Sequence, residues 1–417
     1  MKKVLIIAPL SHASPRIPGL ANYLPEFGWQ PIILTSPFIG ENLRCRFIET
    51  EYSETLEFWR KLFAIGKSED MRASLKERIG VNAQNSTIDR FISFGAGIIN
   101  YPDEVKGWKA FAIKDGNEFL ENEKVDAMIS SSSPVTSHII AKELKIKNNI
   151  PWVADLRDLW SQNHNYGYGP LRKLMDKRLE LKTLAQADAL STVSSNWAEK
   201  LKKLHNGKAT YTITNGYDPN NISKQKINLT SKFTITYTGM IYFKKQNPLK
   251  LFEALQGLIS DRIIDQKDIE IRFFGPEMEW LSIAINRYDL CSIAKQYGVV
   301  SRQESLEKQM ESQLLLLLTW GGQEKAAYSL KSFEYLAARR PILAIGLGND
   351  LTRELLDETN SGIYAPTIED IKSNIIELYS EYKQNGRINY CGDCEKISKY
   401  SYREIARSYV EILENIS

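Results

Sequence analysis

The stretch from Ser329 to Gly346, SLKSFEYLAARRPILAIG, constrains the fold of this chain more than any other. Ser329 is a favoured N-cap residue, and the apolar residues after it recur at three- and four-residue spacing, which predicts a helix. Pro341 ends that helix, because a proline disfavours the helical conformation in the residue before it. The apolar run ILAI that follows is typical of a buried strand. A helix followed directly by a buried strand indicates an α/β fold with a parallel sheet.

The same alternation of apolar runs and helical patterns recurs along the chain. The expected strands are residues 4–8, 31–35, 125–130, 152–154 and 187–194, and then 233–239, 269–274, 314–319 and 342–346. Helical patterns in the second half cover residues 248–260, 278–295, 304–311 and 330–339. A length of 417 residues is too great for one ordinary core. We therefore predict two α/β domains, residues 1–208 and 209–401, with an amphipathic helix over residues 402–417 that packs back on the first.

Composition and motifs argue against several classes of protein. Lysine and arginine number 54 against 51 aspartate and glutamate, so the formal charge of +3 gives no electrostatic reason to expect nucleic acid binding. No apolar stretch approaches the roughly 18 residues of a membrane span, and we expect a cytoplasmic protein. The first expected strand is not followed by GxGxxG, which argues against a dinucleotide dehydrogenase. Cys391 and Cys394 form one CxxC without a nearby histidine, so no metal is expected.

Three loops in the second half carry groups that suit an anionic ligand. These groups are Gly239, Lys244 and Lys245 after one strand, Gly275 after another, and Ser329, Leu330 and Lys331 at the start of the helix. Because the carboxyl ends of parallel strands share one edge, we expect the groups to converge on a diphosphate. Glu334 would repel a phosphate but suits the hydroxyls of a ribose, which favours a nucleoside diphosphate. The alternative is that Lys331 and Glu334 are an exposed pair on an ordinary surface helix.

The segment IPWVADLRDLW, residues 150–160, places further polar groups at a strand end. Its candidates are Asp155, Arg157, Asp158 and Trp160, and the loop after the first expected strand adds His12 and Arg16. Carboxylates accept hydrogen bonds from hydroxyls and an indole offers an apolar face, which is the mixture that a sugar ring needs. The alternative is a structural network in which the acids and the arginine neutralise one another.

Residues 56–63, within the charged and aromatic stretch 51–92, read as an amphipathic basic helix. Such a face suits contact with a membrane surface. The alternative is that its aromatic side packs on the first domain while its lysine and arginine side chains stay solvated.

Six residue groups, taken in order and spacing, resemble the family 4 glycosyltransferases of the GT-B fold, and the resemblance spans nearly the whole chain. They are IIAPLSHASPRIPGLANYLPEFGWQPIILT, YPDEVKGW, VADLRDLW, TITNGYDP, ITYTGMIYFKK and SLKSFEYLAARRPILAIG. The resemblance implies two Rossmann-like domains that face each other across a cleft. It implies an acceptor held mainly by the N-terminal domain and a nucleotide-sugar donor held by the C-terminal domain. It also implies a metal-independent reaction that retains the anomeric configuration of the donor sugar.

The resemblance implies roles for single residues as well. Glu334 matches the second glutamate of the family's EX7E motif, which is expected on the donor ribose. The positions that match the basic, glycine and helix-start groups near the diphosphate are Lys244 or Lys245, Gly239, and Ser329 to Lys331. The first glutamate of the motif would fall on Ala326. Whatever that carboxylate does in relatives is therefore done here by another group or is lost.

The expected function is a glycosyltransferase that moves a sugar from a nucleotide-sugar donor to a glycan, as in polysaccharide biosynthesis, or to a lipid-linked acceptor. We expect the protein to be cytoplasmic. If it contacts a membrane peripherally, the expected membrane surface is the inner face of the cell membrane. The catalytic candidates are Asp155, Asp158 and His12, and the acceptor-binding candidates are Arg16, Arg157 and Trp160. Two alternatives stay open, a nucleotide-sugar epimerase on the same fold and a non-catalytic sugar-binding member. No cofactor is expected, because the nucleotide-sugar is a substrate.

Overall fold

A computed structural model of the chain describes residues 1–12, 15–38, 45–53, 101–163, 166–221, 228–242, 246–319, 328–346 and 350–417. It divides into two compact units, which we describe separately. Unit 1 comprises Met1–Ile213 and Ala406–Ser417, and unit 2 comprises Thr214–Ile405. The sequence-based boundaries were 208/209 and 401/402. Lys244, Lys245, Ala326 and the segment 56–63 lie outside the described residues.

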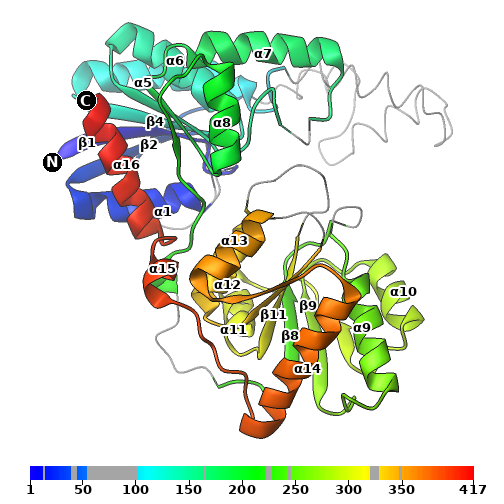
Figure 1. The fold of residues 1–417 in the computed structure, drawn as a ribbon. Helices are drawn as coiled ribbons and strands as arrows, with labels where there is room; N and C mark the ends of the chain where they lie inside the picture. Colours follow the sequence, from blue (N-terminus) through cyan, green and yellow to red (C-terminus); the bar gives the residue numbers. More distant parts are fainter. Residues whose placement is uncertain are drawn as a thin grey trace, which may run out of the picture. The chain divides into compact units, whose positions relative to one another are not determined.

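The described part of unit 1 contains one sheet whose strands all run parallel, in the order β3-β2-β1-β4-β5-β6-β7 (Figure 1). The strands are β1 (Lys2–Ile7), β2 (Trp29–Thr35), β3 (Arg46–Glu49), β4 (Ala127–Ser132), β5 (Trp152–Leu156), β6 (Ala189–Thr192) and β7 (Thr210–Thr212). The central strands are buried apolar runs, as expected of a parallel sheet with helices on both faces. The strand order reverses between β1 and β4, and in α/β sheets ligands bind at such a reversal, outside the carboxyl ends of the strands.

Helices cover both faces of this sheet. They are α1 (Arg16–Tyr23), η1 (Leu24–Phe27), η2 (Lys106–Trp108), α5 (Lys109–Asn122), α6 (Thr136–Asn148), α7 (Pro170–Leu184), α8 (Ser195–Leu204) and most of α16 (Tyr402–Ile416). Helices α5, α6 and α7 lie on one face, and α1 and α16 lie on the other (Figure 1). Most of the C-terminal helix, from Ala406 onward, therefore belongs to the N-terminal unit.

Unit 2 contains a second parallel sheet, in the order β10-β9-β8-β11-β12-β13. Its strands are β8 (Phe233–Thr238), β9 (Ile269–Phe274), β10 (Ala294–Gln296), β11 (Leu314–Leu318), β12 (Ile342–Ile345) and β13 (Gly362–Ala365). Its helices are η3 (Pro219–Asn221), α9 (Leu249–Ser260), α10 (Glu279–Arg287), α11 (Arg302–Met310), α12 (Leu330–Ala338), α13 (Asp350–Thr359), α14 (Ile368–Asn385) and α15 (Cys394–Ser398). Two hydrophobic clusters form the core. One packs α9, α10 and α14 on the sheet, and the other packs α11, α12 and α13.

Two of the predicted elements need correction. The helix expected over residues 278–295 ends at Arg287, and residues 294–296 form the edge strand β10 instead. Asp289 has a φ of 54°, which an α-helix cannot accommodate, and β10 then pairs with β9. The strand expected over residues 152–154 continues to Leu156, so Asp155 lies within β5 rather than after it.

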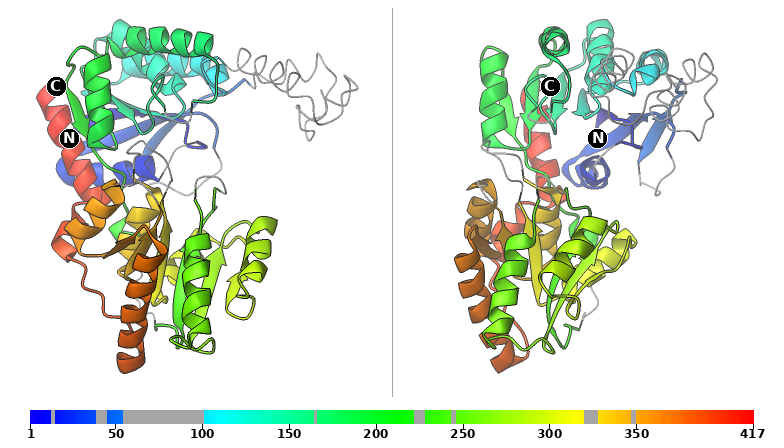
Figure 2. Two further views of the ribbon diagram at one scale, coloured as in Figure 1. Left: turned by 45° about the vertical axis from the view of Figure 1, so that its right-hand side comes forward. Right: turned by 90° about the vertical axis from the view of Figure 1, so that its right-hand side faces the viewer.

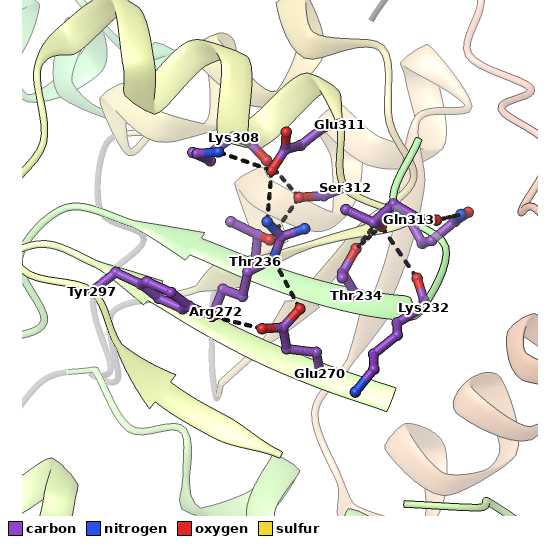
Figure 3. Close-up of polar contacts among 11 residues, drawn as sticks. Lys232, Thr234, Thr236, Glu270, Arg272, Tyr297, Lys308, Glu311, Ser312 and Gln313 are labelled. Carbon is purple, nitrogen blue, oxygen red and sulfur yellow. Dashed lines mark hydrogen bonds and ion pairs between the residues drawn. The ribbon is translucent and has the colours of Figure 1, made fainter. Parts of the chain in front are cut away.

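A network of charged and hydroxyl side chains ties the amino-terminal halves of the strands of unit 2 to the end of α11 (Figure 3). Arg272 on β9 is buried, and its Nη1 donates to Glu311 Oε1 at 2.6 Å. Its Nε lies 3.7 Å from Glu270 Oε2. Ser312 Oγ donates to Thr236 Oγ1 on β8 at 2.6 Å. These bonds hold the turn before β11 against the sheet, at the end opposite the loops that follow β8 and β9.

Within the described residues, no helix combines the length and the apolar character that a membrane span requires.

Candidate functional site

The loops after β8 and β9 meet at the carboxyl edge of the sheet in unit 2. Gly239 N donates to the carbonyl oxygen of Phe274 at 2.6 Å. A Cβ atom on Gly275 would come within 2.4 Å of the carbonyl oxygen of Gly239, so residue 275 has to be a glycine for the two loops to approach this closely. Gly239 itself has a φ of 98°, which side chains other than glycine rarely adopt. The two glycines predicted for ligand binding are therefore adjacent.

Lys331, in the first turn of α12, lies across this junction. A Cβ atom on Gly239 would come within 2.6 Å of its Cε. Its Nζ donates to Tyr237 Oη at 3.0 Å and to the carbonyl oxygen of Met240 at 3.2 Å. Burial lowers the pKa of the Lys331 ammonium to about 8, against an opposing effect of Glu334. A partly desolvated cation beside two glycine loops suits a diphosphate, whereas Lys244 and Lys245, the loop cations expected here, lie outside the described residues.

The start of α12 adds backbone donors to this cation. Ser329 has an extended conformation, and among the described residues no side-chain hydrogen bond caps the helix. The first turn of a helix carries N–H groups without partners inside the helix, and the helix dipole makes that end attractive to anions. Leu330 is exposed and Lys331 is partly buried at this end. Ser329, Leu330 and Lys331 therefore lie where a phosphate could reach their N–H groups.

Glu334 lies one turn after Lys331 on α12. Burial raises the pKa of its carboxyl group, while Arg302 and Lys331 lower it. Its Oε1 lies 3.6 Å from Nη2 of Arg302 at the start of α11. Both side chains line a small cavity between α11 and α12, which Tyr217 also reaches. Lys331 and Glu334 are both half-buried, Lys331 against the turn at Met240 and Glu334 beside the cavity, so they differ from an ordinary exposed pair on a surface helix.

Asp155 and Arg16 lie in the interior of unit 1, fully buried. Arg16 Nη2 lies 3.2 Å from Asp155 Oδ1 and donates to Tyr409 Oη on α16 at 2.8 Å. The carboxylate also accepts from Ser131 Oγ at 2.8 Å and from Ser191 Oγ at 3.0 Å. This network joins α1, β4, β5, β6 and α16, so the structure favours the structural alternative for Asp155 and Arg16. The pairing of two buried, opposite charges is sufficient to explain why Arg16 and Asp155 are in contact, and this explanation requires no bound substrate.

Arg157 and Asp158 follow β5. Arg157 Nε donates to Ser131 Oγ at 3.1 Å, and its Nη2 donates to the carbonyl oxygen of Ser133 at 2.7 Å. Burial lowers the pKa of the Arg157 guanidinium. Asp158 is exposed. Arg157 is thus already engaged by the turn after β4, and neither residue lines the cavity described next.

A cavity of about 460 Å³ in unit 1 brings together two of the predicted residues, His12 and Trp160. Its other lining residues include Asp103, Glu104, Asn163, Tyr166, Tyr168 and Asp176. The His12 imidazole lies 3.6 Å from the Glu104 carboxylate. Aromatic faces and carboxylate oxygens in one cavity suit sugar hydroxyls and C–H faces.

Arg172, which does not itself line the cavity, contacts three residues that do, Tyr166, Tyr168 and Asp176, directly or through a shared hydrogen-bond partner. The Arg172 guanidinium lies between the rings of Tyr101 and Tyr168, 4.5 and 4.6 Å from their centroids. Its Nε donates to Asp176 Oδ2 at 3.0 Å, and Tyr166 Oη donates to the same oxygen. These residues were not singled out from the sequence as site residues. The aromatic and glycine run NYGYG after the VADLRDLW segment was the signal that could have found them.

No protein-family model matches the sequence, and no curated protein matches it. Solved structures do match in fold. Sucrose-phosphate synthase from Thermosynechococcus elongatus matches with a TM-score of 0.62 at 11% identity, over 100% of this chain and 99% of that one. A glycosyltransferase from Rickettsia africae matches with a TM-score of 0.62 at 14% identity, over 100% and 98%. Anabaena HepE in complex with UDP and glucose matches with a TM-score of 0.62 at 11% identity, over 100% of both chains.

These likenesses confirm the expected α/β fold of the GT-B type, with two parallel sheets covered by helices. At this level of sequence identity the likenesses establish the fold alone. The activity has to be argued from the residues of the site.

Proposed function

We propose that this protein is a glycosyltransferase that moves a sugar from a nucleotide-sugar donor to a glycan or a lipid-linked acceptor. The observation that carries the proposal is the junction of Gly239, Gly275 and Lys331 beside the start of α12. HepE, a protein of similar fold, is described with UDP and glucose, which supports a nucleotide-sugar as the ligand of such a junction.

On the donor side, the diphosphate lies against the N–H groups at the start of α12 and the ammonium of Lys331. These groups stabilise the negative charge that develops on the leaving group, so the reaction proceeds without a metal. Lys244 and Lys245 are proposed to contribute further positive charge. Glu334 accepts hydrogen bonds from the ribose hydroxyls, with Arg302 holding its carboxylate.

The transfer breaks the bond between the anomeric carbon and the diphosphate oxygen. A bond forms between that carbon and the acceptor hydroxyl oxygen, on the same face of the sugar. The proton of the hydroxyl passes to the diphosphate oxygen that leaves, so no side chain has to act as the base. This route retains the anomeric configuration.

On the acceptor side, we propose the cavity that contains His12 and Trp160. The indole offers an apolar face, and His12 beside Glu104 orients the attacking hydroxyl. Asp158 remains a candidate for contact with substrate, whereas Asp155 and Arg16 act by positioning the strands and α1.

Titration of the full-length protein with UDP, GDP, ADP and TDP tests the donor site, with binding followed by calorimetry. Lys331→Ala and Glu334→Ala are each expected to weaken binding of the preferred nucleotide by about tenfold or more, because each substitution removes one hydrogen bond that involves a charged group. The matched controls are Lys295→Ala and Glu253→Ala, exposed residues of the same charge in the same unit, which should bind as the unaltered protein does. Undiminished binding in both site variants would rule out the donor site.

Product analysis distinguishes the remaining activities. An epimerase converts the nucleotide-sugar when no acceptor is present, a transferase requires an acceptor for glycoside formation, and a non-catalytic member binds the donor without either reaction.

A further inference from the structure

Helix α7 (Pro170–Leu184) contains two acidic residues, and both lie on the face that packs against the rest of unit 1. Asp176 accepts from Arg172 Nε at 3.0 Å. Glu180 accepts from the backbone N–H of Ser161 at 3.0 Å. Both acids are buried, so neither contributes negative charge to the surface of the helix.

The outward face of the same helix carries three large apolar side chains. Leu171, Leu174 and Met175 are 63%, 48% and 43% exposed, and Tyr168 just before the helix is also exposed. Their spacing of three and four residues places them side by side on one face. Single exposed apolar residues are common on proteins, but a contiguous strip of this kind marks an interaction site.

Exposed cations accompany this strip. Arg178 and Lys182 are exposed and follow Leu174 at four-residue steps, which places them on the same face. Lys177 is exposed on the flank of the helix, and the ammonium of Lys173 lies over the Tyr166 ring instead. The outward face of α7 therefore combines aliphatic side chains with the positive charges of Arg178 and Lys182, while both acids of the helix are buried. Figures 1 and 2 show α7 running along the outside of the described helical layer of unit 1.

We propose that the outward face of α7, defined by Leu171, Leu174, Met175, Arg178 and Lys182, docks on an anionic lipid surface. Aliphatic side chains enter the boundary between head groups and acyl chains, while lysine and arginine attract the anionic head groups. A nucleic acid would use the cations but leave the leucines without an apolar partner. A second copy of the same face would bring the positive charges of Arg178 and Lys182 against those of the other copy, which disfavours self-association.

The position of this face relates it to the proposed acceptor. Tyr168, just before α7, and Asp176, on its buried face, also line the cavity that contains His12 and Trp160. Docking by α7 would hold that cavity beside the lipid surface, where the head group of a lipid-linked acceptor lies. This relation rests on the proposed function, whereas docking itself does not.

Co-sedimentation of the full-length protein with vesicles tests the proposal. Vesicles of phosphatidylcholine with phosphatidylglycerol should bind the protein. Vesicles of phosphatidylcholine alone should bind it at least about tenfold more weakly, because the electrostatic attraction is lost. Leu171→Glu with Leu174→Glu should reduce binding to the anionic vesicles by about tenfold or more, since both apolar contacts go and negative charge is added. Arg178→Glu with Lys182→Glu should have a similar effect.

The matched control is Ile146→Glu, which adds the same charge at an isoleucine that is 59% exposed on the neighbouring helix α6. This variant should bind vesicles as the unaltered protein does. All the altered residues are exposed and lie in unit 1, so circular dichroism and nucleotide binding by unit 2 should stay unchanged.

Two results would overturn the proposal. One is that the unaltered protein binds both kinds of vesicle equally, and the other is that the α7 variants bind anionic vesicles as well as the Ile146→Glu control does. Loss of a dimer in the Leu171 and Leu174 variant, measured by sedimentation velocity without lipid, would overturn it in favour of self-association. Failure of nucleotide binding in every variant and in the unaltered protein would count against the proposed donor site instead.

Discussion

The charge of Lys331 is expected to control nucleotide affinity in a narrow pH range. Its pKa is lowered to about 8, so the ammonium loses its proton between about pH 7 and about pH 9, where a free lysine stays charged. Across that range the charged fraction falls from about nine-tenths to about one-tenth. The terminal phosphate of a nucleoside diphosphate is already ionised above about pH 7. If only the charged amine binds the phosphate, the Kd rises about tenfold, or about 1.4 kcal/mol.

Calorimetric titration with the preferred nucleoside diphosphate at several pH values measures this change. Lys331→Arg is the control, because a guanidinium stays charged over the whole range and should abolish the pH dependence while keeping much of the affinity. Lys331→Met should bind weakly at every pH. A profile for the unaltered protein that is as flat as that of the arginine variant would refute the assignment of Lys331 to the phosphate.

Three further outcomes are expected. Tyr409→Phe removes the hydroxyl that accepts from Arg16, and should lower the unfolding free energy of unit 1 by about 1–2 kcal/mol in urea denaturation while leaving nucleotide binding unchanged. Glu311→Leu leaves the buried Arg272 without its closest partner and should destabilise unit 2 by about 2–4 kcal/mol, with Glu369→Leu, an exposed acid on α14, as the neutral comparison. Trp160→Ala should raise the KM for the acceptor at least about tenfold without altering the Kd of the donor.

Much of the fold was predictable, because the strands are short apolar runs with clear ends. The runs at residues 31–35, 233–239, 269–274 and 342–346 each became a parallel strand within one or two residues of the expected limits. The pattern failed at residues 278–295, where helical periodicity continued past Arg287 but an edge strand formed. Hydrogen bonding to β9 decided that segment, and a partner distant in sequence leaves no local signal.

The residues of the proposed donor site could be singled out from the sequence for a physical reason. A glycine directly after a parallel strand marks a loop where the backbone must pass close to another group, and Gly239 and Gly275 meet there. Lys331 and Glu334 were placed on one helix by their spacing alone. The contact of Lys331 with Tyr237 and the carbonyl of Met240 depends on β8, which is about 90 residues earlier in the chain, and the sequence could not show it.

For the residues proposed on the acceptor side, the sequence does not show which side chains are buried in a structural network and which line a cavity. Asp155 and Trp160 stand five residues apart in one segment, with the same polar and aromatic character around them. Only the fold shows that Asp155 is buried against Arg16 and Tyr409, whereas Trp160 lines a cavity with Tyr166 and Asp103.

By itself, then, the sequence determined most of the strands, the α/β fold class and the glycine and lysine positions of the proposed donor site, because periodicity, capping and turn residues act over a few neighbours. The tertiary structure alone decided which charges are structural and which reach a cavity. It also decided that the acids of α7 are buried while Leu171, Leu174 and Lys182 face outward. Burial and pairing depend on elements far apart in the chain, and no local pattern encodes them.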